Sequence, residues 1–167
     1  MKANFFRAFL ALTIVLIMVS CSSNSSDGIS TNKSIITTYN YNETESKLII
    51  LINNYRQSIG LNTLDVINHI SFKSEEHNIY MIEHNLVNHD YFQQRSDNLI
   101  LVLGAERVGE NIAYNYKTAE NAFSAWMNSP GHRANIEGDY THFGIAVTTD
   151  DLTGKKYYTN MFIKKKL

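Results

Sequence analysis

The sequence predicts an α+β fold in which helices pack on a small antiparallel sheet. Two amphipathic helical patterns fill residues 44–59 and 65–84, and a third covers residues 118–127. Two strand-like runs, 143–149 and 155–164, follow near the C-terminus and are separated by a turn-forming segment. Helices followed by an antiparallel hairpin are typical of the α+β class. A further strand near residues 110–116 is expected to join this sheet.

Caps and apolar spacing define the first two helices. Thr44 is a suitable N-cap for the first helix and Gly60 ends it, while apolar residues recur every three or four positions between them. Asp65 opens the second helix, whose positions at helical spacing share one face that we expect to point inward. That face carries Ile70, Ser74, His77, Met81 and His84.

The histidines of the second helix have two interpretations. His77 and His84 lie two turns apart and could be metal ligands, but a histidine on a buried face is more often a hydrogen-bonded core residue. We favour the structural interpretation for both. His69 and His142 have no partner pattern, and we assign them to the surface.

The second half of the chain is punctuated by turn residues. Residues 88–92 predict a loop or a short helix, and Arg95 lies a little beyond them. Thr118 caps the third helix, which ends at the break Ser129-Pro130-Gly131. Residues 150–154 form the turn of the C-terminal hairpin.

The N-terminus predicts a leader and a tether before one domain. Lys2 and Arg7 precede a dozen apolar residues too short to span a bilayer comfortably, and Cys21 follows at once. Met18-Val19-Ser20-Cys21 resembles a bacterial lipobox, which implies acylation of Cys21 and an extracytoplasmic, lipid-anchored protein of the cell envelope. The alternatives are an uncleaved membrane anchor or a cleaved peptide with an incidental cysteine. We therefore expect a signal peptide over 1–20, a flexible tether over 21–43 and a domain over 44–167.

Composition excludes one class of partner. Without residues 1–20 the chain has 13 basic and 16 acidic residues, a net charge of −3 with no basic footprint, which argues against nucleic-acid binding. Cys21 is the only cysteine, so its acylation would leave no thiol for a disulfide, a nucleophile or a metal ligand.

The stretch from Val108 to Asn135 carries the ionisable groups of a predicted cleft. It opens with Gly109-Glu110-Asn111-Ile112-Ala113 and closes with a Trp126-to-Asn135 segment that contains His132. Turn chemistry at both ends and a helix between them can bring a carboxylate and an imidazole to the rims of one cleft. Ser129 lies three residues before His132, but the Gly-x-Ser-x-Gly turn that exposes a catalytic serine is missing.

Several separated motifs together resemble the CAP or SCP domain of cysteine-rich secretory proteins, venom antigens and plant pathogenesis-related proteins, especially its bacterial secreted branch. They occur in family order over roughly residues 46–163: 51–56, Gly60-Leu61 with Leu64, His77 and Met81, 89–92, 109–113, 126–135, 144–147 and 158–162. The resemblance implies an α-β-α sandwich with a small central antiparallel sheet flanked by helices. It also implies a cleft lined by two histidines and two acids, here His89, Glu110 and His132. Ser129 stands where the family's second acid is usual.

These side chains support hypotheses of different classes. His89, Glu110 and His132 could bind zinc or another divalent cation and activate a water, giving a metal-dependent hydrolase of peptide or ester bonds. The alternative, which we favour, is a polar hydrogen-bonded cluster in a module that binds a lipid, an envelope polymer such as a glycan, or a protein partner. A purely structural surface lipoprotein is the third possibility. The sequence thus leans away from an enzyme.

Overall fold

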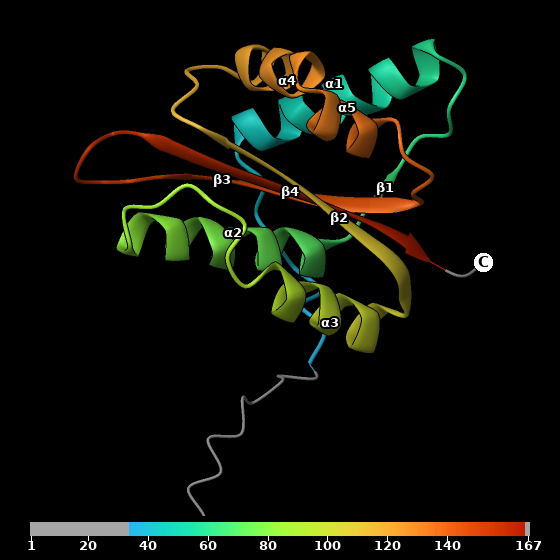
Figure 1. The fold of residues 1–167 in the computed structure, drawn as a ribbon, viewed down its shortest axis with the longest axis horizontal. Helices are drawn as coiled ribbons and strands as arrows, with labels where there is room; N and C mark the ends of the chain where they lie inside the picture. The colour runs from blue at the N-terminus through green and yellow to red at the C-terminus, as the bar shows by residue number, and fades with distance from the viewer. Residues whose placement is uncertain (1–33, 166–167) are drawn as a thin grey trace, which may run out of the picture. The chain divides into compact units, whose positions relative to one another are not determined.

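The computed structural model describes residues 34–165 and shows an α-β-α sandwich, as the sequence predicts (Figure 1). α1, α4 and α5 cover one face of a central sheet, and α2 and α3 cover the other. Within the described residues, no helix is both long and apolar enough to cross a bilayer. The elements in chain order are α1 (Glu43–Ser58), β1 (Asp65–Val66), α2 (Asn68–Glu83), α3 (Phe92–Leu103), β2 (Ala105–Tyr114), α4 (Ala119–Asn128), α5 (Pro130–Ile136), β3 (His142–Thr149) and β4 (Lys156–Lys165).

The sheet has the strand order β1-β3-β4-β2, so β2 forms one edge. The predicted C-terminal hairpin is present as β3 and β4, and β4 also pairs antiparallel with β2. The two-residue β1 adds a parallel pairing with β3, so the sheet is mixed rather than wholly antiparallel. Because side chains alternate along a strand, Tyr158 and Phe162 of β4 pack in the α1/α4/α5 layer while Met161 and Ile163 pack beneath α2 and α3.

The N-cap of α1 lies two residues before the predicted one. Asn42, not Thr44, is the N-cap: its side chain accepts the N–H of Glu45 at 3.0 Å, and the Glu45 carboxylate accepts the N–H of Asn42 at 2.8 Å. Glu45 is 2 % exposed and also accepts the N–H of Val147 on β3 at 2.7 Å. This capping box therefore fixes α1 to the sheet as well as starting the helix.

Residues 34–42, which the sequence places in the tether, pack along α2. Ile36 donates its N–H to Nδ1 of His69 at 3.1 Å, and Asn68 donates to the carbonyl of Thr37 at 2.7 Å. The Tyr41 hydroxyl is 2.8 Å from Oγ of Ser71. The packed part of the chain thus begins before the predicted boundary at residue 44. The predicted leader, the lipobox and Cys21 lie outside the described residues.

Three predictions for α2 need correction. Asp65 belongs to β1, where it pairs with His142, and α2 starts only at Asn68. His84 is exposed, because the helix ends at Glu83 and His84 is its C-cap. His69 is 1 % exposed rather than on the surface, since its Nε2 lies 2.8 Å from Oδ1 of Asn98 and its Nδ1 accepts from residue 36.

The close contact between α2 and β3 depends on Gly144. A Cβ at this position would lie 2.4 Å from the backbone nitrogen of Ser71 and 2.7 Å from the backbone carbon of Ile70, neither of which can rotate away. We predict that Gly144→Ala lowers the free energy of unfolding by about 2 kcal/mol or more, because the helix must move off the sheet. Urea denaturation measures the effect. The matched control is Gly131→Ala, where a Cβ meets nothing within 4 Å, and an equal loss there would contradict this explanation.

Candidate functional site

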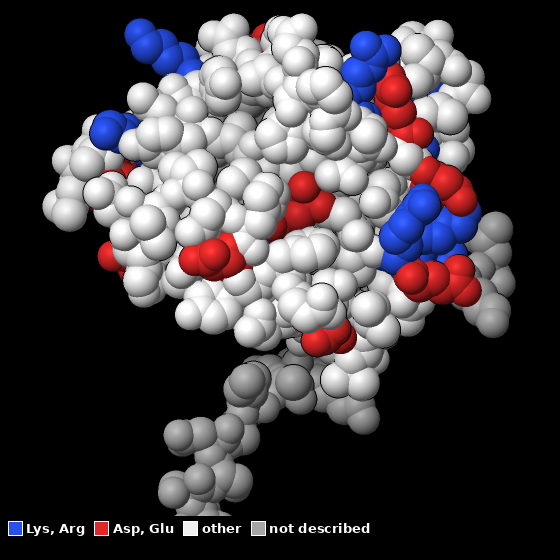
Figure 2. Space-filling model, in the orientation of Figure 1, with Lys and Arg blue, Asp and Glu red and all other residues white. Residues whose placement is uncertain are grey.

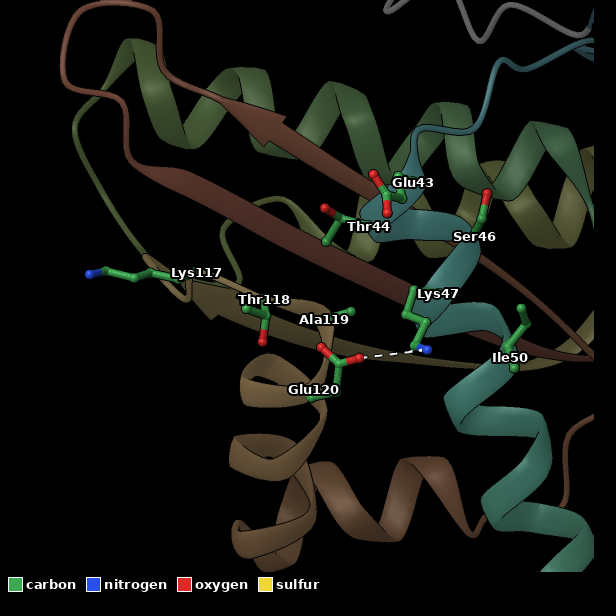
Figure 3. A pocket seen from close by; sticks show the side chains of 9 residues that line it. All are labelled: Glu43, Thr44, Ser46, Lys47, Ile50, Lys117, Thr118, Ala119 and Glu120. Atoms are coloured by element: carbon green, nitrogen blue, oxygen red, sulfur yellow. Dashed lines mark ion pairs between the residues drawn. The ribbon is translucent and has the colours of Figure 1, made fainter.

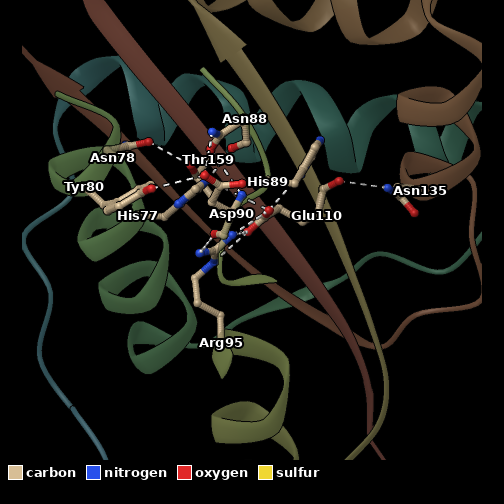
Figure 4. Close-up of polar contacts among 10 residues, drawn as sticks. All are labelled: His77, Asn78, Tyr80, Asn88, His89, Asp90, Arg95, Glu110, Asn135 and Thr159. Atoms are coloured by element: carbon tan, nitrogen blue, oxygen red, sulfur yellow. Dashed lines mark hydrogen bonds and ion pairs between the residues drawn. The ribbon is translucent and has the colours of Figure 1, made fainter. Parts of the chain in front are cut away.

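Glu110 on the edge strand β2 is the centre of a buried polar cluster on the α2/α3 side of the sheet (Figure 4). Its side chain is only 2 % exposed. Three segments far apart in the sequence meet it: His77 from α2, His89 from the loop after α2, and Arg95 from α3. A buried carboxylate is tolerated only when charged or polar partners replace its water.

Both oxygens of Glu110 are occupied by side-chain donors. Arg95 donates from Nε to Oε2 at 2.9 Å and from Nη2 to Oε1 at 2.8 Å, a two-point contact that uses the planar guanidinium. Nδ1 of His89 lies 2.8 Å from Oε1. Since a carboxylate can only accept, Nδ1 of His89 carries a proton, and in the neutral form of the ring the lone pair is on Nε2. That nitrogen has no hydrogen-bond partner among residues 34–165, and the His89 side chain is 49 % exposed.

Arg95 is the site residue that sequence reasoning missed. It sits in α3, where the sequence predicted only a loop or short helix, because Tyr91 precedes the helix in a left-handed conformation without a capping side chain. A third N–H, from Nη1, donates to the carbonyl of Asp90 at 2.7 Å and holds the His89 loop against the helix. The available signal was the apolar run ending at Gly104, which takes the left-handed conformation of a helix stop.

His77 lies beneath this cluster as a neutral core residue, in agreement with its structural interpretation. It is 1 % exposed, its Nε2 is 2.9 Å from the carbonyl of Asn88, and the same atom is 4.0 Å from Oε1 of Glu110. Its Nδ1 is buried and has no partner within the described part of the chain. Burial, and secondly the charge of Arg95, lowers the pKa of His77 to about 4.

The structure brings His89 and Glu110 together as predicted, but places His132 and Ser129 in a neighbouring hollow. His89 and Glu110 line a hollow of about 300 Å³ with Phe92, Val108, Gly109 and Asn135. A second hollow, of about 310 Å³, is lined by Ile112, Ala113, Tyr114, Tyr116, Ala125, Trp126, Ser129 and His132. Burial, and then the charge of His89, lowers the pKa of His132.

Side chains of α4 and α5 hold these helices against β2 between the hollows. Asn135 donates to the carbonyl of Glu110 at 3.1 Å and to Oδ1 of Asn111 at 2.8 Å. Asn111 in turn donates to the carbonyl of His132 at 2.9 Å, and the indole N–H of Trp126 donates to the carbonyl of Ile112 at 2.9 Å. The Gly-Glu-Asn and Trp-to-Asn motifs are therefore neighbours in space, as the sequence predicts for Val108 to Asn135.

The donor set does not fit the three-ligand metal site proposed from the sequence. Glu110 already accepts from Arg95 and His89, and a cation at its oxygens would face the Arg95 guanidinium. Among the described residues, no group of three or more His, Cys, Asp and Glu side chains is arranged to hold a metal ion. Glu110 is thus better suited to orient His89 than to bind a metal.

A larger hollow, of about 520 Å³, lies between the N-terminal ends of α1 and α4, away from this cluster (Figure 3). Lys47 and Glu120 form a 3.7 Å ion pair across it, and both side chains are more than half exposed. Exposed pairs of this kind are screened by water and salt. We therefore place the functional site at β2, where the charges are buried and oriented.

We predict that Arg95→Met lowers the free energy of unfolding by about 3–5 kcal/mol, because it leaves the buried Glu110 carboxylate without its counter-charge. Adding Glu110→Gln to this variant restores part of the loss. Urea denaturation of the double-mutant cycle measures the coupling. The control Arg133→Met, which breaks the surface pair with Glu137, should cost less than about 1 kcal/mol. Additive losses in the cycle would contradict the pairing of Arg95 with Glu110.

We predict that the buried His77 makes the free energy of unfolding depend on pH in the acid range. Its pKa is about 4 in the folded protein and 6.5 for the free side chain, so the unfolded chain binds the proton more tightly. The contribution of His77 is complete above pH 6.5 and is lost as the pH falls towards 4, by up to about 3 kcal/mol. His77→Gln should remove this part of the slope, whereas His84→Gln, at an exposed position, should retain it. Equal slopes for wild type and His77→Gln would refute the assignment.

Comparison with known proteins agrees with this fold. Residues 49–162 match the profile of the CAP, or cysteine-rich secretory protein, family. The protein YkwD of Bacillus subtilis is 31 % identical over 125 residues, which are 72 % of this chain and 47 % of YkwD. The membrane protein YlbC of the same organism is 48 % identical over 61 residues, 36 % of this chain and 16 % of YlbC. The chain thus spans less than half the length of these two relatives.

Two solved structures share the architecture. An outer surface protein of Borrelia burgdorferi superposes with a TM-score of 0.69 at 20 % identity, over 77 % of this chain and 97 % of that protein, which shows the shared fold. An extracellular SCP-domain protein of Bacillus anthracis gives a TM-score of 0.64 at 28 % identity, over 73 % of this chain and 40 % of that one. The match over residues 49–162, on a sandwich that carries the predicted motifs, shows that the chain belongs to the CAP family of cysteine-rich secretory proteins.

Proposed function

We propose that this CAP domain is an extracytoplasmic binding module, held at the bacterial cell envelope by a lipid on Cys21, whose cleft along β2 binds an envelope ligand. The observation that carries the proposal is the state of Glu110: Arg95 and His89 use both of its oxygens. The carboxylate therefore serves to orient the half-exposed His89 at the rim of an open hollow. An oriented imidazole beside an open cavity with both apolar and polar lining is a recognition element for a lipid, a glycan or a protein.

The named relatives favour the same location. The Bacillus anthracis protein is described as extracellular, the Borrelia burgdorferi protein as an outer surface protein, and YlbC as a membrane protein. A leader followed by a single cysteine suits an envelope protein of this kind. Acyl chains on Cys21 would hold the domain near a bilayer, and the segment after it would set the distance from the surface.

The proposal predicts saturable binding that depends on His89. The full chain in mild detergent micelles should bind to an envelope extract of its host, measured by pull-down and by surface plasmon resonance. His89→Ala should weaken this binding about tenfold, because the only oriented imidazole of the first hollow is lost. The control His84→Ala removes an exposed histidine outside both hollows and should leave binding unchanged. Equal binding by wild type and His89→Ala would remove the support for this site.

A hydrolase is the second candidate, and one observation favours it. Glu110 fixes the proton on Nδ1 of His89, which makes Nε2 a candidate general base for an attacking water in peptide or ester hydrolysis. The metal-dependent form of this hypothesis uses His89, Glu110 and His132 as zinc ligands. We expect zinc to leave the thermal midpoint unchanged, since Glu110 is engaged by Arg95. A midpoint that rises with zinc concentration, and falls back in His132→Ala, would favour the hydrolase over the binding module.

A further inference from the structure

The outer edge of β2 presents backbone groups that no other strand of the described chain covers. Asn115 donates its N–H to the carbonyl of Lys156, and hydrogen-bonded pairs alternate along an antiparallel ladder. Residues 109, 111 and 113 therefore bond to β4. The residues between them, Val108, Glu110 and Ile112, direct their N–H and carbonyl groups away from β4, towards the open edge of the sheet.

The carbonyls of Glu110 and Ile112 on this edge are occupied, but their amides are not. Asn135 donates to the carbonyl of Glu110, and Trp126 donates to that of Ile112, which also confirms that these carbonyls point outward. The N–H groups of Glu110 and Ile112 have no acceptor among residues 34–165. Glu110 is 6 % exposed as a whole residue although its side chain is 2 % exposed, so its accessible part is mainly backbone. Unpaired amides on a sheet edge that no other strand covers are ready to bind an acceptor.

Each free amide belongs to a residue that lines one of the two hollows. Glu110 borders the hollow with His89, and Ile112 borders the hollow with Ser129 and His132. The two hollows follow one another along the same strand. Within the part of the chain that the structure describes, no Lys or Arg lines either of them, and the Asp90 carboxylate is exposed beside His89. In Figure 2 the basic groups of this face lie towards the periphery, whereas acidic groups lie both there and near the middle.

We propose that the ligand is an extended, uncharged or weakly basic polypeptide segment that docks along β2 and accepts hydrogen bonds from the N–H groups of Glu110 and Ile112. This deepens the proposed binding function and rests on it. Amides two residues apart on a strand are spaced by about 6.6–6.8 Å, which matches the spacing of alternate carbonyls in another extended chain. The side chains of such a segment would enter the two hollows, as in other cases of strand addition. The exposed Asp90 carboxylate beside His89 favours a neutral or cationic segment.

In this recognition the protein donates the main-chain hydrogen bonds and the ligand accepts them. Since Asn135 and Trp126 already donate to the edge carbonyls, the ligand contributes acceptors at these positions rather than a full ladder. Because the donors are main-chain groups, binding should tolerate changes of ligand sequence. A panel of short peptides is therefore a fair test, and its failure counts against the inference.

The test is amide NMR with hydrogen exchange on the ¹⁵N-labelled full chain in mild detergent micelles. The probes are blocked heptapeptides of alternating valine and threonine, with two threonines replaced by lysine or by aspartate in two further peptides. Without a probe, the amides of Glu110 and Ile112 should exchange at least about tenfold faster than those of Asn111 and Ala113, which bond to β4. The neutral and lysine peptides should slow the exchange of the Glu110 and Ile112 amides and shift their resonances. The aspartate peptide should bind several-fold more weakly.

Variants that fill the second hollow, which Ser129 and His132 line, provide another test. Ser129→Phe should weaken peptide binding about tenfold, whereas Ser124→Phe, on the exposed side of α4, should not. Ala125→Leu fills the same hollow if Ser129→Phe does not fold. Slow exchange at Glu110 and Ile112 in the free protein, or peptide binding that leaves their amides unchanged, overturns the inference.

A saccharide probe separates this inference from the broader binding function. Should a tetramer of N-acetylglucosamine shift the His89 resonances while every peptide fails, strand recognition is wrong and the binding module stands. If, in addition, wild type and His89→Ala bind the envelope extract equally, both proposals fail.

Discussion

The burial of one carboxylate constrains the architecture around the cleft. Glu110 is placed on the sheet edge with almost no access to water, so it must be given a counter-charge and donors from the protein itself. Arg95 supplies two of them and His89 a third. That requirement fixes the position of α3, the course of the loop between α2 and α3, and the tautomer of the exposed histidine. Burial lowers the pKa of the Arg95 guanidinium, and Glu110 opposes this shift.

On the side of β2 that faces α4 and α5, backbone carbonyls of the strand accept the hydrogen bonds that position the helices. α4 and α5 each contribute one side chain, Trp126 and Asn135, that donates to a main-chain oxygen of the edge strand. Asn111 completes the connection by donating to the carbonyl of His132. These contacts explain why the Gly-Glu-Asn and Trp-to-Asn motifs occur together: one supplies the carbonyls and an amide, and the other supplies the donors. His132 and His89 line different hollows, and the charge of His89 still contributes to lowering the pKa of His132.

Local patterns predicted most of the fold and part of the site. The period of apolar residues and the Thr118 cap located α4, and the turn at 150–154 located the hairpin, because these signals lie within a few residues of the structure that they specify. α3 was missed because its start lacks a capping side chain. Arg95 was missed with it, since an arginine fifteen residues from its carboxylate leaves no local trace. The burial of His69 likewise depends on Asn98 and Ile36, which only the tertiary structure brings close.

The path of the N-terminal segment has a mechanical consequence. If the chain is held at its N-terminus, any pull on the domain enters through residues 34–42, whose hydrogen bonds run along the side of α2. Those bonds would bear the load first and could peel away one after another. Beyond them, the Asn42–Glu45 box and its bond to Val147 transfer tension directly into the sheet, at β3 rather than at the edge strand β2. The segment can thus yield under traction while the binding surface keeps its shape.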